Sequence, residues 1–285
     1  MKVESYIDLN LYLQAVEEYL LKNEVKNNLP IGILYSLKDA EEDKTKDLFF
    51  SRVVDDNKNI LLAIMTPPQN LIIVGEDNDK TTEAIKALIE YLSDNTIDIP
   101  GVIGEKILAE KFKKQWLIMR ESEVELFMAQ RIFKLTNLNQ VEIASGLFRR
   151  VKLDDLEIIK DWYISFNQES LSKKIDEEKA RNHVRKAIES GRYYGWEKEC
   201  RLVSIASRAR NTKNAVAVNF VYTPEEYRGN GYATSTVAKL SQELLNEGYK
   251  YCCLFTDLAN PTSNSIYKKI GYEPIADYLV YNFSD

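Results

Sequence analysis

A strand, a glycine-rich turn and a helix follow one another between residues 215 and 244, and this succession constrains the fold more than any other feature. The apolar run Ala215–Tyr222 stops at Pro224, and after the turn apolar residues recur at helical spacing. The turn reads Arg228-Gly229-Asn230-Gly231. A helix N-terminus offers unpaired backbone N–H groups, and glycines let a ligand approach the backbone closely. The segment therefore predicts an anion site of the kind that holds a diphosphate.

The spacing within the turn decides which kind of diphosphate loop it is. The segment contains neither the dinucleotide fingerprint G-x-G-x-x-G nor the nucleotide loop G-x-x-x-x-G-K followed by Ser or Thr. It reads Arg228-x-x-Gly231-x-Ala233 directly after a strand that ends in Val-Tyr-Thr-Pro. This segment resembles the coenzyme A pyrophosphate loop of the GNAT superfamily of N-acetyltransferases. The alternative is a surface turn that uses glycine only for its geometry.

A second segment, residues 257–272, supports the same resemblance. Asn260 is expected to cap a helix with Pro261 at its first position, and Gly271 is expected to end it. The order Asn, Asn, Tyr, Gly-aromatic is similar to the GNAT segment that flanks the thioester end of coenzyme A. The resemblance implies that Asn260 contacts the pantetheine arm and that Tyr267 protonates the departing thiolate. The alternative is that Tyr267 is a half-buried packing residue.

The resemblance thus implies one catalytic residue, Tyr267, and acetyl-CoA as co-substrate without a metal. Backbone N–H groups of the strand Ala215–Tyr222 are expected to stabilise the oxyanion. This strand carries Asn219 and Tyr222 but no carboxylate, so we assign no general base. The cofactor contacts are expected at Phe220, Val221, Tyr222, Arg228, Gly229, Asn230, Gly231, Tyr232, Ala233, Asn260, Ser263, Asn264 and Tyr267.

The sequence contains no motif for the amine acceptor, so its candidate residues are chosen by location. The resemblance places the amine between the first two helices of the domain and the turn before the central strand. Lys268 and Lys269 are candidates for the 3′-phosphate of coenzyme A, although a solvated helix end explains them equally well. The acceptor candidates by location are Trp162, Phe166, Glu169, Trp196, Arg208 and Tyr222.

The element order predicts two domains. Residues 138–285 read as strand, two helices, three antiparallel strands, helix, strand, helix and a final strand near 277–283, which is the complete GNAT layout. The resemblance implies an α/β (α+β) fold with a mixed, mostly antiparallel twisted sheet flanked by helices.

Residues 1–137 repeat part of this order, with helices expected at 11–22, 81–92 and 105–114 and strands at 47–54, 59–65, 71–75, 101–104 and 124–135. We expect a degenerate GNAT-like domain there, because Glu76-Asp77-Asn78-Asp79 replaces the loop and would repel a pyrophosphate. The alternative is an unrelated α+β domain.

Composition limits the classes of partner. The chain has 38 Lys and Arg against 44 Asp and Glu, a net charge of −6, which argues against nonspecific nucleic-acid binding. The 3 Cys do not form a disulfide framework, and His183 is the only histidine, so a Ser-His-Asp triad is not expected. We find no signal peptide in the first residues and no apolar run long enough for a membrane, and we expect a cytoplasmic protein.

Three functions remain in view. The first is an acetyl-CoA-dependent N-acetyltransferase acting on a primary amine of a small molecule or peptide, with Tyr267 as general acid. The second is an acyl-CoA-binding sensor or regulatory module without turnover, which the missing base keeps in view. The third is a scaffold whose loop is vestigial.

Overall fold

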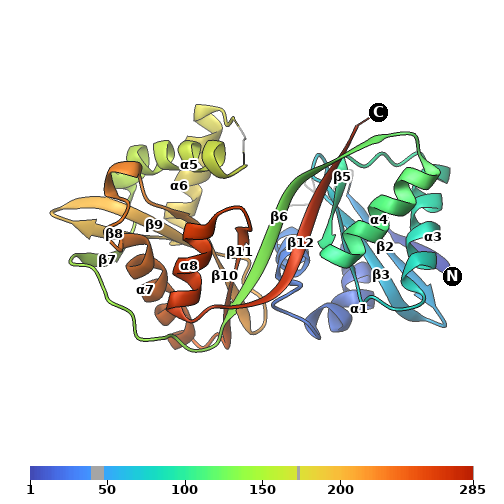
Figure 1. Cartoon of the computed structure of the whole chain (residues 1–285), viewed down its shortest axis with the longest axis horizontal. Coiled ribbons are helices and arrows are strands. Elements are labelled where there is room, and N and C mark those ends of the chain that lie inside the picture. The colour runs from blue at the N-terminus through green and yellow to red at the C-terminus, as the bar shows by residue number, and fades with distance from the viewer. Residues whose placement is uncertain (40–47, 172–173, 285) are drawn as a thin grey trace. The chain divides into compact units, whose positions relative to one another are not determined.

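The computed structural model describes residues 1–39, 48–171 and 174–284, and the chain forms two compact units (Figure 1). Unit 1 contains Met1–Ile132, Asp257–Ala259 and the residues from Ile275 onward. Unit 2 contains Phe133–Thr256 and Asn260–Pro274. Within the described residues, no helix combines the length and the apolar character needed to cross a bilayer.

In unit 1, the strands that the structure describes form a sheet that carries helices on both faces. Its strands lie in the order β1-β2-β3-β4-β5-β12, antiparallel except for the parallel pair β4 and β5. Side chains of a strand alternate between faces, so Leu61 and Ala63 pack in the cluster of α3 and α4, whereas Leu62 and Ile64 pack with α1 and α2. The elements are β1 (Lys2–Tyr6), α1 (Leu9–Leu21), α2 (Asn28–Lys38), β2 (Phe49–Asp55), β3 (Lys58–Met65), β4 (Leu71–Gly75), α3 (Thr81–Asp94), β5 (Gly101–Glu105), α4 (Lys106–Met119) and β12 (Glu273–Ser284).

Unit 2 has the same kind of architecture. Its strands follow the order β11-β10-β9-β8-β7, with β10 and β11 parallel and β7 to β10 antiparallel. Strand β6 is the other neighbour of β11 in the sheet, but only its last residues, from Phe133, belong to unit 2. One core cluster joins the sheet to α7 and α8 and another joins it to α5 and α6. The elements are the end of β6 (Glu123–Leu135), most of which belongs to unit 1, and β7 (Leu147–Arg150), α5 (Leu156–Leu171), α6 (Glu177–Glu189), β8 (Tyr193–Lys198), β9 (Arg201–Ala209), β10 (Ala215–Tyr222), the 3-10 turn η3 (Glu225–Tyr227), α7 (Tyr232–Asn246), β11 (Tyr251–Asp257) and α8 (Pro261–Ile270).

The succession of elements is the same in both units: strand, two helices, three strands, helix, strand, helix. This mixed, mostly antiparallel sheet flanked by helices is the predicted fold class. Strand β1 and helix α2, which complete the succession in unit 1, were not predicted from the sequence. Asp47, the first residue of the strand predicted at 47–54, lies outside the described residues.

The last strand differs from the prediction. Residues 277–283 were expected to close the C-terminal domain, but β12 pairs antiparallel with β5, from Tyr278 opposite Glu105 to Asn282 opposite Gly101. It belongs to unit 1 from Ile275 onward. The compact units therefore do not follow a single cut at residues 137 and 138.

Candidate active site

Strands β10 and β11 separate soon after they begin to pair. Their parallel register covers only Ala215–Ala217 opposite Tyr251–Cys253, although β10 continues to Tyr222 and β11 to Asp257. A register shift against β9 between Asn219 and Tyr222 bends β10 at this point. The separation leaves the last residues of β10 without β11 as a ladder partner, so their backbone groups can face a ligand.

The loop after β10 ends in a helix N-terminus that no side chain caps. Gly229 and Gly231 have φ angles of 84° and 77°, which glycine adopts far more readily than other residues. Gly231 is the N-cap of α7 and makes no side-chain capping bond. The N–H groups of the first turn have no partner within the helix, and the helix dipole adds partial positive charge. This end of α7 is therefore suited to an anion.

The start of α8 forms the other side of the site. The Asn260 side chain accepts a hydrogen bond from the Ser263 backbone N–H at 3.0 Å, Pro261 occupies the first turn, and Gly271 ends the helix with φ of 113°. All three predictions for this helix are confirmed. The capping bond fixes the side chain of Asn260, which lines the cavity described next.

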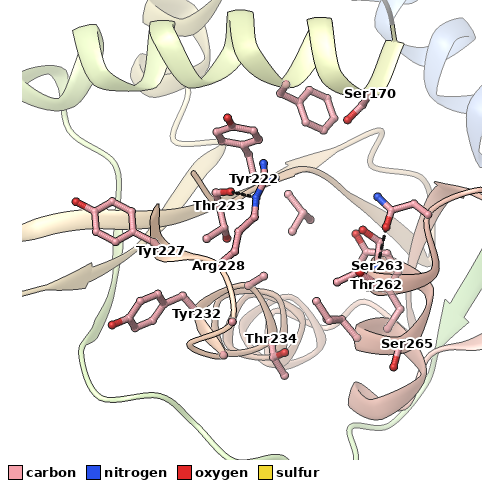
Figure 2. Close-up of a pocket in the computed structure, with 18 of the residues that line it drawn as sticks. Ser170, Tyr222, Thr223, Tyr227, Arg228, Tyr232, Thr234, Thr262, Ser263 and Ser265 are labelled. Atoms are coloured by element: carbon pink, nitrogen blue, oxygen red, sulfur yellow. Dashed lines mark hydrogen bonds between the residues drawn. The ribbon is translucent and has the colours of Figure 1, made fainter. Parts of the chain in front are cut away.

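A cavity of about 510 Å³ lies within unit 2 between these elements (Figure 2). Its volume is in the range typical of small-molecule sites. Helix α5 borders it opposite α7, as Figure 2 shows. Ten predicted cofactor residues line it: Val221, Tyr222, Arg228, Gly229, Gly231, Tyr232, Ala233, Asn260, Ser263 and Tyr267.

Three predicted cofactor residues do not line the cavity. Phe220 is only 6% exposed and packs against Phe166 and Tyr163 with ring centroids 5.2 and 5.5 Å apart. The Asn230 side chain donates to two carbonyls of its own loop at 3.1 and 3.2 Å. The Asn264 side chain donates to the Asn260 carbonyl at 2.7 Å. The side-chain amides of Asn230 and Asn264 therefore stabilise the backbone of the loop and of the start of α8.

Tyr267 is a core residue that also lines the cavity. It is 7% exposed, and its ring lies 6.2 Å from that of Phe133 and 6.0 Å from that of Tyr272. Burial raises the pKa of Tyr267 to about 12, although a hydrogen bond with Ser263 acts in the opposite direction. The phenol is therefore protonated at any ordinary pH and has a fixed position.

The acceptor candidates divide into two groups. Phe166, Glu169 and Tyr222 line the cavity, as does Lys269. Trp162 of α5 and Trp196 of β8 are buried, so both are core residues and not part of the cavity lining. Lys268 does not line the cavity, and Arg208 forms an ion pair with Glu247 at 2.8 Å instead. The cavity is also lined by residues that were not predicted, of which only Thr223, Tyr227 and Thr234 adjoin the loop motif; the others are Ser170, Thr262, Ser265 and Ile266.

A polar network crosses the cavity from α5 to the loop. Glu169 Oε1 accepts a hydrogen bond from the Tyr222 hydroxyl at 3.0 Å, and Glu169 Oε2 accepts one from Arg228 at 2.8 Å. Arg228 Nε also donates to the Thr223 carbonyl at 2.9 Å, and Figure 2 shows its side chain extending toward Thr223 and Tyr222. Burial is the main reason why the pKa of Tyr222 is raised, and the Glu169 carboxylate adds to it. In this structure the Arg228 charge is thus engaged by a carboxylate.

The corresponding turn of unit 1, between β4 and α3, is closed. The backbone N–H of Asn78 donates to Thr81 Oγ1 at 2.8 Å, and Thr81 Oγ1 donates to the Glu76 carbonyl at 2.9 Å. A cavity of only about 10 Å³ lies beside it, lined by Tyr19, Val74 and Glu76 among others. That volume suits one water molecule at most. Asp77 forms an ion pair with Lys111 of α4, which holds the turn to that helix.

Comparisons with known proteins agree with this geometry. A family model described as GNAT acetyltransferase matches residues 48–281. The fold is similar to that of a Drosophila protein (TM-score 0.67, 11% identity, 99% of this chain and 98% of that one). It is also similar to a GNAT-family acetyltransferase from Colwellia psychrerythraea (TM-score 0.61, 11% identity, 99% of both chains). A third similar structure is an N-acetyltransferase from Sphaerobacter thermophilus (TM-score 0.61, 11% identity, 87% and 83%). A search of curated proteins finds no match.

Proposed function

The chain belongs to the GNAT acetyltransferase family, and from this premise we propose that unit 2 transfers the acetyl group of acetyl-CoA to a primary amine of a small molecule or peptide. The observation that carries the proposal is the 510 Å³ cavity. It is lined both by the uncapped N-terminus of α7 and by the buried Tyr267, and it lies where β10 and β11 separate. Family membership supports acyl transfer in general; the amine acceptor is our inference.

The cofactor contacts follow from the lining of the cavity. In this proposal the first turn of α7 and the loop at Gly229 and Gly231 bind the diphosphate through backbone N–H groups. The end of β10, freed from β11, lies along the pantetheine arm, with Asn260 on the other side. Lys269 is the cation on α8 that is available to the 3′-phosphate.

Tyr267 is the proposed acid. When the neutral amine attacks the thioester carbon, an N–C bond forms and the C–S bond breaks; the nitrogen gives up a proton to water and the sulfur takes one from the acid. The Tyr267 phenol holds its proton until that moment because its pKa is raised to about 12. It donates a hydrogen bond to the sulfur as negative charge develops, passes the proton to it as the C–S bond breaks, and is then reprotonated by water. Because the OH is fixed by packing and by Ser263, little reorganisation is needed at that moment.

We propose that unit 1 is a degenerate copy of the same fold that does not bind coenzyme A. The shared succession of elements supports a common origin, and the closed turn with its carboxylates explains the loss of the anion site. This leaves unit 1 a structural role.

The second candidate function is an acyl-CoA-binding sensor. It is favoured by one observation: strand β10, which is described throughout, contains no carboxylate that could act as a base. A sensor would bind acetyl-CoA at the same place without turnover.

The test combines binding and turnover. Calorimetry with acetyl-CoA measures the affinity, and release of free thiol from acetyl-CoA in the presence of a panel of primary amines measures transfer. Tyr267→Phe removes only the hydroxyl, so we expect turnover to fall about 10²-fold or more while acetyl-CoA affinity stays the same. Wild-type binding without turnover for any amine would favour the sensor, and absence of binding would refute both candidates.

A further inference from the structure

Glu169 has a special place in the cavity because of its charge. Among the described residues that line the cavity, it is the one acidic side chain, and Arg228 and Lys269 are the basic ones. An acceptor amine enters largely as an ammonium ion, and a carboxylate is the side chain that best receives it. Glu169 is therefore the only side-chain anion of the described lining that could serve this purpose. In the unliganded protein, however, Arg228 already occupies it.

The ion pair between Glu169 and Arg228 is easy to exchange. The two side chains are 48% and 49% exposed, and exposed pairs contribute only a factor of about 1.4 to 5 to an equilibrium constant. Arg228 lies three positions before the N-cap of α7, next to the proposed diphosphate site. A diphosphate there carries more negative charge than one carboxylate and competes for the same guanidinium.

Glu169 would remain oriented after such an exchange. The Tyr222 hydroxyl donates to its other oxygen, Oε1, at 3.0 Å, and Tyr222 packs against Phe166 of α5 with ring centroids 6.5 Å apart. When the Arg228 side chain moves to the diphosphate, Glu169 Oε2 becomes free while Tyr222 still fixes the carboxylate. The free oxygen can bind the incoming ammonium, which then loses a proton to water so that the neutral amine can attack the thioester.

We propose that Glu169 receives the ammonium of the acceptor, and that the diphosphate of the cofactor exposes it by drawing Arg228 away. This inference rests on the proposed function, because it requires coenzyme A in the cavity. It makes Glu169 a specificity-determining residue that selects cationic acceptors, and it makes acceptor binding follow cofactor binding.

The first arm of the test measures free coenzyme A by calorimetry. In Glu169→Gln, Arg228 has no carboxylate to leave, so we expect binding about 1.4 to 5 times tighter than in the matched control Glu226→Gln. Glu226 is an exposed carboxylate in the loop that contains Arg228, and it does not line the cavity. Its variant removes the same charge as Glu169→Gln. In an Arg228→Gln background the two variants should bind equally, because the effect acts through Arg228.

The second arm uses a probe that requires no knowledge of the acceptor. Coenzyme A is alkylated at sulfur with a short tail that ends in a primary ammonium, and a matched probe ends in a hydroxyl, each with two to four methylenes. We expect the wild type and Glu226→Gln to prefer the ammonium tail about fivefold or more, and Glu169→Gln to lose this preference.

The outcomes separate the two proposals. If Glu169→Gln binds coenzyme A no tighter than Glu226→Gln, or if it keeps the preference for the ammonium tail, the inference is wrong although the cofactor site remains. If no wild-type tail length shows a preference, the acceptor role of Glu169 is wrong. If the wild type does not bind coenzyme A at all, the proposed function fails, and the inference fails with it.

Discussion

Replacing Gly231 with glutamate tests the proposed diphosphate site directly. Gly231 is the N-cap of α7 and lines the cavity, and an added Cβ there would meet no atom closer than Ala144 Cβ at 3.9 Å. The variant can therefore fold. Its φ of 77° makes any L-residue strained, which costs about 1–2 kcal/mol. The new carboxylate enters the proposed diphosphate site and repels the diphosphate.

Gly248 provides the matched control. It follows the other end of α7, its φ is 105°, and an added Cβ would meet no atom within 4 Å. Gly248→Glu thus introduces the same charge and at least as much backbone strain, at a position that does not line the cavity. Gly248→Glu should therefore lose at least as much stability as Gly231→Glu, but only Gly231→Glu should lose the response to ligand.

The assay is thermal unfolding with and without coenzyme A. At about 100 times its dissociation constant, a ligand that binds only the folded state stabilises it by about 2.7 kcal/mol. For a protein of this size, 1 kcal/mol corresponds to about 2–4 °C, so the wild type and Gly248→Glu should shift by about 5–10 °C. Gly231→Glu should not shift. A shift retained in Gly231→Glu, or lost in Gly248→Glu, would refute the assignment of the α7 N-terminus as the diphosphate site.

Further predictions concern single side chains. Because burial raises the pKa of Tyr267 to about 12, turnover should show no alkaline limb from this residue up to pH 10; a limb that Tyr267→Phe removes would contradict this. Asn260→Ala removes the cap of α8 and should lower the free energy of unfolding by about 1 kcal/mol, whereas Asn260→Ser, which can still cap, should lower it much less; equal losses in denaturant titrations would argue against the cap. Burial also lowers the pKa of His183, so the unfolded chain takes up a proton below about pH 6.5 that the folded chain does not. Relative to His183→Phe, the wild type should therefore lose stability as the pH falls from 7.5 to 5, and a constant difference between their urea midpoints would refute this reasoning.

Local patterns predicted the parts of the site that depend on local chemistry. Asn260, Pro261 and Gly271 define the limits of α8 through capping preferences that act within a few residues. The glycines at 229 and 231 likewise have the positive φ angles that the loop motif requires. These features could be predicted because neighbouring residues determine them.

Phe220 illustrates what local patterns could not predict. Alternation along β10 would place Phe220 on the same face as Val216 and Val218, which pack toward α7 and α8. The register shift after Asn219, with Phe220 at φ of 44°, turns the ring into the cluster of α5 and α6 instead. A β-bulge depends on pairing between strands, and the sequence of one strand does not reveal it.

The two missed elements of unit 1 have similar explanations. Helix α2 contains Pro30 and Gly32, which disfavour a helix in isolation, but both are buried by tertiary packing. Strand β1 reads Lys-Val-Glu-Ser-Tyr and is stabilised by its pairing with β2. The ion pair of Glu169 with Arg228 also joins residues 59 positions apart, which no motif indicates.

The pairing of β12 with β5 has a consequence for synthesis of the chain. The side-chain amide of Asn70 donates to the Tyr281 carbonyl at 3.3 Å, so the first unit is completed by residues that are translated more than two hundred positions later. At about 5–20 residues per second, the ribosome needs roughly 10–35 s to travel from Glu105 to its partner Tyr278. During that interval the edge of β5 is without β12 while the second unit emerges. A nonsense codon shortly before Ile275 would therefore damage the part of the protein that was made first.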